Sequence, residues 1–333
     1  MIVNNLNSFL ALFFSLTFTV ISIWAILYFN LFSNIQDKPN IRSLHKESKA
    51  RTGGIIFIPI IILMWFFSGL DSPFYLTLTI ICLMTVSFLD DLRNTSAGVR
   101  FIFHIIFISF FVFFLNIDLN LFYLGLVVLF LVWMTNLFNF MDGSDGMAAG
   151  MAVIGFFSYA ITSYIAGDYS FALKNGIIMM CSLSFLLFNF SSAKIFMGDV
   201  GSISLGFLSG AMGIIGWQKE LWSIWYPLLI FSPFIVDSST TLLKRIYRKE
   251  KFWQPHREHY YQRLILMGWS HKKTALISYV VMICVSLIGL YSNLVHNHEF
   301  ILVIIFLGYF LPMLYIDIIW KNYLLNNKGR NKR

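Results

Sequence analysis

The stretch from Asn120 to Gly146, NLFYLGLVVLFLVWMTNLFNFMDGSDG, joins an apolar run to a cluster of polar side chains. Residues 120–138 carry no charge, and at 1.5 Å per residue they can cross a hydrocarbon core about 30 Å thick. Residues 139–146 then hold two aspartates, an asparagine and two glycines. Ionisable groups beside hydrocarbon are costly, so we interpret them as part of a functional site. The stretch therefore predicts a membrane helix that ends in such a site.

The composition extends this interpretation to the whole chain. Hydrophobic residues make up 58% of the 333 and charged residues 12%, and the mean hydropathy is +0.74. Soluble domains carry about 25% charged residues, so we predict an all-α polytopic membrane protein. Its expected spans lie near 8–30, 54–70, 73–89, 101–116, 120–138, 147–166, 172–190, 201–217, 222–243, 275–292 and 300–320, which makes about eleven transmembrane helices.

Neither the cysteines nor the first apolar run indicates a functional site. Cys82, Cys181 and Cys284 lie inside apolar spans, so we interpret them as small buried hydrophobic residues without a disulfide framework. The first apolar run has no Lys or Arg before it and no clear cleavage site, which predicts a retained anchor rather than a removed signal peptide.

The basic residues orient the chain. With eleven spans, 22 of the 24 Lys and Arg fall on one face, and the other face keeps Lys174 and Lys219. The positive-inside rule makes the rich face cytoplasmic, with the N-terminus outside and the C-terminus inside. We expect one integral-membrane domain over 1–320 and a basic cytoplasmic tail over 321–333 that attracts anionic lipid. The cytoplasmic loops of the domain are 31–53, 90–100, 139–146, 191–200 and 244–274.

Five carboxylates fall on that cytoplasmic face, namely those of Asp90, Asp91, Asp142, Asp145 and Asp199. Carboxylates among lysines and arginines at a membrane surface suit a divalent cation and a polyphosphate substrate. The topology signal alone explains the basic residues, but it does not explain the acidic ones.

Two of the clusters lie at the ends of predicted helices. The adjacent carboxylates of Asp90 and Asp91 repel each other, attract a cation and can include a base; an ordinary acidic loop is the alternative. Asn136, Asn139 and Asp142 are spaced by three and share one face of a continued helix, where they can bind a metal directly or through water. A capped turn between helices is the alternative there.

Two more clusters follow along the chain. Asp199 precedes Gly201, Ser202 and the next apolar helix. The N-terminal amides of a helix favour negative charge nearby, which is consistent with a role of Asp199 in the site. The alternative is that Asp199 only caps this helix. In the longest cytoplasmic loop, 255–263 reads PHREHYYQR, and its histidines and arginines are good donors to pyrophosphate. The loop lacks the His-Glu-x-x-His pattern, so a zinc protease is not supported.

Taken together, these clusters resemble the polyprenyl-phosphate N-acetylhexosamine-1-phosphate transferase family, of the glycosyltransferase family 4 type. The Asn-Phe-Met-Asp-Gly form and the His-Arg-x-His-x-Tyr-Gln loop are more similar to its O-antigen-initiating branch than to the peptidoglycan one. The chain departs from the family pattern over 47–54, at Ser192 and at Gly98. The matching pieces, in family order, are 37–45, Asp90 with Asp91, Arg100 with His104, 139–146, 196–202, 234–237 and 256–262.

The resemblance implies the reaction and its partners. A UDP-N-acetylated amino sugar and undecaprenyl phosphate would give undecaprenyl-diphospho-sugar and UMP, in the first membrane step of lipopolysaccharide O-antigen or other cell-envelope polysaccharide synthesis. It implies Mg²⁺, with Mn²⁺ as an alternative, a multi-pass place in the bacterial inner membrane, and no nucleic acid. The branch favours QuiNAc or FucNAc, with GlcNAc and GalNAc as alternatives. A homodimer and an aspartyl-phosphate intermediate stay open.

The resemblance also implies roles for individual residues. The metal ligands would be Asp199, Asn139 and Asp91, and Asp90 would deprotonate or orient the lipid phosphate. The catalytic set is Asp90, Asp91, Asp199 and His256. Asn189 and Asp142 would hold uridine, His256, Arg257 and His259 the pyrophosphate or sugar, and Arg100 and Arg42 the lipid phosphate. The further substrate-binding candidates are His45, Asn136, Asp145 and Lys194.

Two other functions compete with this one. A cation-coupled transporter would carry its acidic residues near the middle of its spans. The five aspartates named above lie instead at one end of their predicted helices. Asp237 and Asp317 lie deeper; Asp317 can pair with Lys321 one turn on, and Asp237 can support the site. An alcohol phosphatidyltransferase needs Asp-Gly-x-x-Ala-Arg followed by two spaced aspartates, which the stretch at residues 144–147 does not supply.

Overall fold

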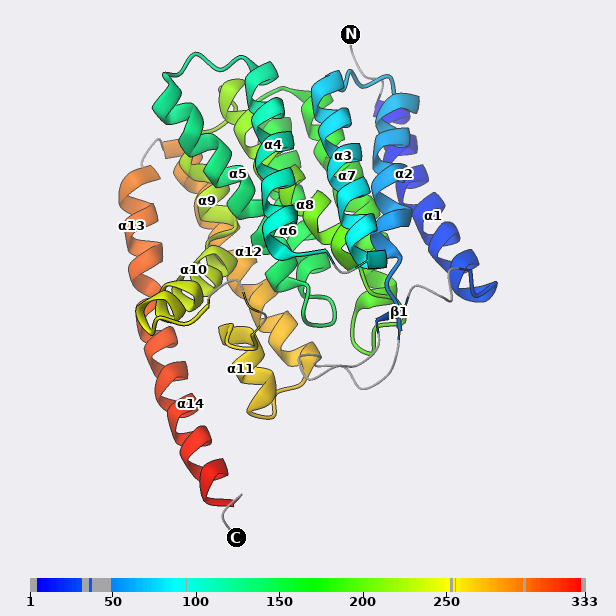
Figure 1. Ribbon diagram of the computed structural model, residues 1–333. Coiled ribbons are helices and arrows are strands. Elements are labelled where there is room, and N and C mark those ends of the chain that lie inside the picture. Colours follow the sequence, from blue (N-terminus) through cyan, green and yellow to red (C-terminus); the bar gives the residue numbers. More distant parts are fainter. Residues whose placement is uncertain are drawn as a thin grey trace.

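The computed structural model describes residues 5–31, 36–37, 49–93, 95–251, 254, 256–295 and 298–330, and it confirms the all-α polytopic fold (Figure 1). One short pairing of strands, β1 (Gln36–Asp37) with β2 (Lys49–Ala50), joins the helices. The helices are α1 (Asn5–Tyr28), α2 (Gly53–Phe67), α3 (Phe74–Arg93), α4 (Ala97–Leu115), α5 (Leu121–Met141), α6 (Met147–Ile165), α7 (Tyr169–Asn189), α8 (Gly198–Gln218), α9 (Trp225–Ile230), α10 (Ser232–Tyr247), α11 (Tyr260–Leu266), α12 (His271–Val295), α13 (His298–Gly308) and α14 (Phe310–Arg330).

Helix α8 forms the centre of the bundle, because 89% of its most apolar window is buried. Its sequence, GDVGSISLGFLSGAMGIIGWQ, is rich in glycine and serine, which let neighbouring helices approach closely. A Cβ on Gly206 would lie 2.6 Å from the carbonyl oxygen of Met134 in α5. Helices α2, α3 and α5 pack around α8. The bundle therefore surrounds the helix whose first turn carries Asp199.

The predicted spans agree with the helices, with four differences. The expected span 300–320 is divided at Tyr309 into α13 and the start of α14. Among the described residues, nine helices are long and apolar enough to cross a membrane, and α2, at 15 residues, is shorter than expected for 54–70. The expected span 222–243 is broken into α9 and α10, because the proline in the first turn of α10 has no N–H to continue a helix from α9. Helix α14 continues through Lys321 to Arg330, so this part of the predicted tail is helical.

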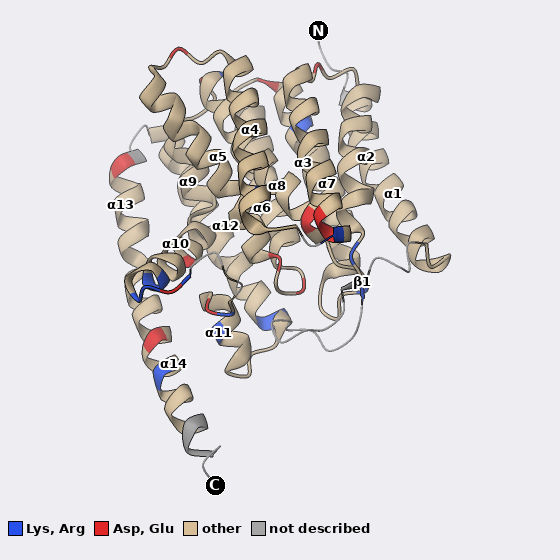
Figure 2. Ribbon diagram, in the orientation of Figure 1, with Lys and Arg blue, Asp and Glu red and all other residues tan. Residues whose placement is uncertain are grey.

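The charged residues are unevenly distributed along the bundle. Figure 2 shows most of the described lysines and arginines near the end that carries α10, α11 and β1. Lys174 and Lys219 lie toward the other end, where Lys219 pairs with Asp168 at 2.8 Å. Burial opposes ionisation of Asp168, but the hydrogen bond from Lys219 holds its pKa below the usual value. Which end faces the cytoplasm stays a prediction of the positive-inside rule.

The two ends of α7 test the orientation. Ser170 and Ser192 are both exposed and lie at opposite ends of this helix, which at 1.5 Å per residue is about 30 Å long. In a variant lacking Cys82, Cys181 and Cys284, we expect a cysteine at Ser170 to react with an impermeant maleimide added outside intact cells. A cysteine at Ser192 should react only after the cells are opened. Labelling of Ser192 from outside would contradict the predicted orientation.

Candidate active site

The site begins where the segment before α2 docks against the segment before α8. The N–H of Phe196 donates to the carbonyl of Ala50 at 2.8 Å, and the N–H of Gly54 donates to that of Met197 at 2.8 Å. A Cβ on Gly54 would lie 2.1 Å from the backbone nitrogen of Gly201, so only glycine fits this crossing. The starts of α2 and α8 therefore touch, and Arg51 comes to lie beside Asp199.

Three aspartates and two arginines form an ion-pair group, here called the acid cluster: Asp90, Asp91, Asp199, Arg51 and Arg100. Arg51 lies 3.3 Å from Asp91 and 3.0 Å from Asp199. Arg100 Nη1 lies 2.5 Å from Asp90 and 2.9 Å from Asp199. The two aspartates come from the last turn of α3, Arg100 from the first turn of α4, and Asp199 from the first turn of α8. Each guanidinium thus bridges two carboxylates and offsets their repulsion.

Asp90 and Asp91 have different surroundings although they are neighbours. Asp90 Oδ1 accepts hydrogen bonds from the N–H of Thr95 at 2.7 Å and from its hydroxyl at 2.6 Å. Both oxygens of Asp91 are buried and make no hydrogen bond of ordinary geometry among the described residues. The charge of Arg51 and the nearby backbone of Asp199 compensate this carboxylate. A buried carboxylate with two unsatisfied oxygens is costly and favours a further cation.

The predicted metal ligands lie together. Asn139, at the end of α5, donates its amide to Asp199 Oδ1 at 3.1 Å and to the Ser202 hydroxyl at 3.1 Å. Carboxylate and amide oxygens are the donors that Mg²⁺ prefers, and the buried oxygens of Asp91 would suit such an ion. Asn139 turns its NH₂ group, not its oxygen, toward Asp199 in this structure. Among the described residues no three His, Cys, Asp or Glu side chains already form a metal cage, since the arginines lie between the carboxylates.

The loop from Asp142 to Gly146 is held on several sides. Asp145 Oδ2 accepts the N–H of Ala193 at 3.1 Å, and the N–H of Gly146 donates to Asn189 Oδ1 at 2.9 Å. Ser144 Oγ lies 2.9 Å from Nδ1 of His271, which begins α12. Gly146 adopts a φ of +76°, a backbone conformation that favours glycine. The loop is therefore fixed relative to α7 and α12.

Several predicted substrate-binding residues lie away from the acid cluster or have structural partners. Asn136 donates to the carbonyl of Val132 in its own helix. Asn189 is buried and uses both ends of its amide, on Gly146 and on the carbonyl of Ile195. Lys194 is exposed. Arg42 and His45 lie outside the described residues.

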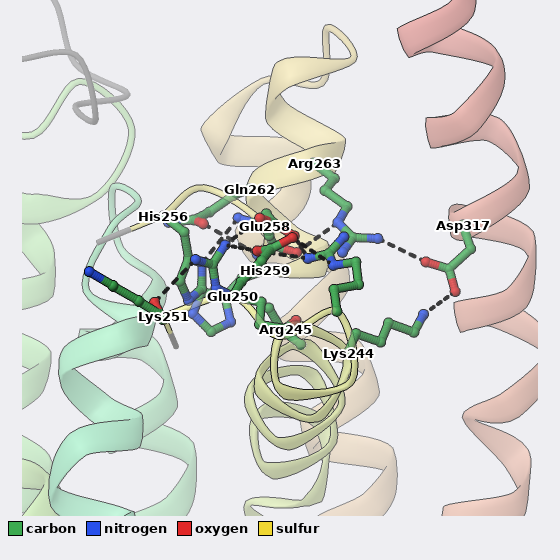
Figure 3. Close-up of polar contacts among 12 residues, drawn as sticks. Lys244, Arg245, Glu250, Lys251, His256, Glu258, His259, Gln262, Arg263 and Asp317 are labelled. Carbon is green, nitrogen blue, oxygen red and sulfur yellow. Dashed lines mark hydrogen bonds and ion pairs between the residues drawn. The ribbon is translucent and has the colours of Figure 1, made fainter. Parts of the chain in front are cut away.

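A second group, here called the histidine loop, runs from His256 to His259 before α11. Glu258 forms an ion pair with Arg245 of α10 (Figure 3) and another with Arg248, the residue that follows this helix, and the two pairs hold the loop against its end. Burial would raise the pKa of Glu258, but the hydrogen bond and charge of Arg248 lower it. Burial and the neighbouring His259 and Arg245 lower the pKa of His256 to about 4. His256 is therefore a neutral imidazole at pH 7.

The histidine loop docks onto the last turn of α5. The ring of His259 stacks on Phe140 with centroids 5.6 Å apart, and the Tyr261 hydroxyl donates to the Phe140 carbonyl at 2.8 Å. The ring of His256 packs on that of His259 at 4.9 Å. Because Phe140 follows Asn139, the loop and the acid cluster are joined through adjacent residues of one helix.

The sequence analysis missed Arg51, Thr95 and His271. Arg51 lies in the segment 47–54 that departs from the family pattern, and its only sequence signal is its place two residues before Gly53 and Gly54. Thr95 carries no signal beyond its position near Asp90 and Asp91, and His271 follows no motif of the site. Asp317 was predicted to pair with Lys321; instead it pairs with Lys244 and with Arg263 at 2.8 Å, because α14 packs against α11.

Known proteins share much of this chain. A family model described as glycosyl transferase family 4 matches residues 73–217. A probable undecaprenyl-phosphate N-acetylglucosaminyl 1-phosphate transferase of Bacillus subtilis (strain 168) is 30% identical over 263 residues, which cover 74% of each chain. Phospho-N-acetylmuramoyl-pentapeptide-transferases are also similar. That of Staphylococcus saprophyticus is 32% identical over 60% of this chain and 59% of its own, and that of Halalkalibacterium halodurans is 30% identical over 53% of each.

Asp199 gives the sharpest test of the acid cluster, because it contacts both arginines and Asn139. We expect Asp199→Asn to remain in the membrane and to lose more than about a hundredfold in turnover, since an amide binds Mg²⁺ more weakly than a carboxylate. Asp118→Asn, at an exposed position in the loop between α4 and α5, is the matched control and should keep wild-type turnover. Turnover of Asp199→Asn within about threefold of wild type would contradict the assignment.

Proposed function

This chain belongs to glycosyl transferase family 4, among the polyprenyl-phosphate N-acetylhexosamine-1-phosphate transferases, and we propose that it transfers an N-acetylated amino sugar 1-phosphate from a UDP-sugar to undecaprenyl phosphate. One observation carries the proposal beyond the family likeness. Two guanidiniums bridge three carboxylates at the ends of membrane helices. Such a place suits a reaction between a soluble anion and a lipid phosphate at the interface.

The proposed reaction is a phosphoryl transfer. An oxygen of undecaprenyl phosphate attacks the β-phosphorus of the UDP-sugar, which carries the sugar. The bond from that phosphorus to the bridging oxygen breaks, and UMP leaves with the bridging oxygen and the electron pair. Such transfers depend mostly on positioning the reactants in line and on stabilising the developing negative charge.

The arginines are proposed to receive the phosphates. Arg51 and Arg100 have side chains about one-third exposed, at 37% and 31%, while Asp91 and Asp199 are nearly covered. A guanidinium binds a phosphate with the same paired geometry as a carboxylate, so an incoming phosphate can share or replace one carboxylate partner. Asp90, which lies 2.5 Å from Arg100, is then proposed to deprotonate or orient the lipid phosphate.

The metal is proposed to be Mg²⁺, with Mn²⁺ as the alternative. Asp199, Asp91 and Asn139 would hold it, for which the Asn139 amide would have to turn its oxygen toward the ion, because its NH₂ group donates to Asp199 here. Its chemistry there would be to neutralise charge on the pyrophosphate and on the leaving UMP.

The histidine loop is proposed to hold the pyrophosphate or the sugar. His256, kept neutral by its lowered pKa, can donate one ring N–H without adding charge. Arg257 has a buried Nε with no partner among the described residues, which supports a role in binding an anion. Asp142 is proposed for the uridine end. Asn189 is assigned instead to support of the 142–146 loop, because its oxygen accepts the N–H of Gly146 and its NH₂ group donates to the carbonyl of Ile195.

The sugar and the pathway are finer parts of the proposal. The forms of the motifs at 139–143 and 256–262 favour a 6-deoxy amino sugar and O-antigen initiation in a bacterial inner membrane. The name of the Bacillus subtilis relative favours GlcNAc. These alternatives differ at the C4 epimer and the C6 hydroxyl, which a few contacts distinguish.

The test is an assay on purified protein with undecaprenyl phosphate, Mg²⁺ and UDP-GlcNAc, UDP-GalNAc, UDP-QuiNAc or UDP-FucNAc in separate reactions. We expect one sugar to give a lipid product whose mass exceeds that of undecaprenyl phosphate by one N-acetyl sugar phosphate, together with stoichiometric UMP. Release of UDP instead of UMP would mean transfer of the sugar alone and would overturn the proposal.

Asp90 and Asp199 should differ in a second measurement. A general base acts mainly in the transition state and contributes about 10²–10⁴-fold to the rate, whereas a metal ligand also supports binding of the ground state. We therefore expect Asp90→Asn to lose kcat while Mg²⁺-dependent binding of UDP-sugar persists, and Asp199→Asn to lose both. Equal loss of nucleotide-sugar binding in the two variants would place Asp90 in the metal site.

A further inference from the structure

The start of α11 is held by a carboxylate from another helix. Asp237, in the second turn of α10, accepts the N–H of Tyr260 on Oδ1 at 2.9 Å and the N–H of Tyr261 on Oδ2 at 3.1 Å. The first N–H groups of a helix have no partner within it, so an acceptor here fixes where the helix begins. The side chain of Asp237 is 12% exposed, so water competes little for these bonds.

The same carboxylate contacts His259. Nδ1 of His259 lies 3.3 Å from Asp237 Oδ1, and the His259 side chain is 3% exposed. An ionised carboxylate only accepts hydrogen bonds, so this contact favours the tautomer with the proton on Nδ1. The backbone N–H of Gln262 faces the same side chain in the capping box of α11 and favours the opposite tautomer, so Asp237 and Gln262 compete for it. The other ring nitrogen, Nε2, is then the one available to a substrate. The orientation of the ring is fixed as well, because Phe140 and Tyr261 stack against it with centroids 5.6 Å and 6.0 Å away.

We propose that Asp237 is a positioning residue of the active site, which fixes the ring orientation and the tautomer of His259 so that Nε2 serves the substrate. This inference rests on the proposed function for the identity of the substrate, a pyrophosphate or its sugar. When Nε2 donates to a phosphate oxygen, the carboxylate on Nδ1 also balances the positive charge of the ring. A carboxylate that orients a histidine through its second nitrogen is a frequent arrangement in enzyme sites.

A second carboxylate provides the matched control, because it holds the same helix without contacting His259. Asp317 of α14 pairs with Arg263 of α11 at 2.8 Å and with Lys244 of α10. Figure 3 shows Asp317 beyond Arg263, away from His256. Asp317→Asn should therefore loosen α11 without changing the hydrogen bond on His259, whereas Asp237→Asn should change it.

The first measurement does not depend on turnover. In protein labelled with ¹⁵N only in its seven histidines, the His259 signals are assigned by their absence in His259→Ala. We expect Nδ1 to be protonated in the wild type and in Asp317→Asn. In Asp237→Asn we expect the proton to move to Nε2 in a measurable fraction, because the amide can present its NH₂ group to the ring. An unprotonated Nδ1 in the wild type, or the same change in both variants, would overturn the proposal.

The second measurement is a double-mutant cycle on kcat and KM. Loss of a group that orients an active-site residue costs about 10–100-fold, so we expect Asp237→Asn to lower kcat by that factor with little change in KM. The loss should disappear in the His259→Ala background, because Asp237 then has no ring to position. Any loss of kcat caused by Asp317→Asn should be the same in the His259→Ala background as in the wild type. A loss from Asp237→Asn that also persists in full would show that Asp237 only supports the fold.

The two proposals fail in different ways. If no UDP-sugar gives a lipid product with the wild-type protein, the proposed function is wrong, and the ¹⁵N signals still decide whether Asp237 sets the tautomer of His259. If the product forms but the cycle is additive and the tautomer is the same in both variants, the transferase assignment stands and the role of Asp237 is wrong.

Discussion

The structure depends on the placement of Asp199 between two guanidiniums. Arg51 and Arg100 each contact this carboxylate and one further aspartate, at distances of 2.5–3.3 Å. Three carboxylates gathered at the ends of apolar helices would otherwise repel one another in surroundings that solvate charge poorly. Because the guanidiniums come from the segment before α2 and from α4, the ion pairs also determine how these elements sit against α3 and α8.

Close packing of backbones makes this placement possible. The glycine contact between Gly54 and Gly201 brings the starts of α2 and α8 together, and the small residues along α8 let it lie at the centre of the bundle. A larger side chain at either glycine would separate the helices and move Arg51 away from Asp199. The geometry of the polar site therefore depends directly on how closely the membrane helices pack.

The position of the histidine loop, at the edge of the bundle, is also set by contacts with other helices. Its position comes from α10 and the residue after it, through Asp237 and the arginines that bind Glu258, and from α5, through Phe140. The break between α9 and α10 allows this, because α10 starts anew at Ser232 and does not simply extend α9. Residues of four helices, α5, α8, α10 and α11, thus meet around the end of α5, where the predicted metal ligand Asn139 lies.

The sequence by itself determined the class of fold, most of the helix positions and the residue types of the site, because these depend on local hydropathy and on short motifs such as 139–146. It did not determine that 222–243 is broken, since hydropathy does not reveal a change of helix direction. Nor did it assign partners: Asp317 pairs with Arg263 rather than Lys321, and Arg51 pairs with Asp199 across 148 residues. Such pairs depend on which helix ends pack together. The sequence pattern does not reveal this, because it does not show which distant residues are close in space. Only the tertiary structure could decide them.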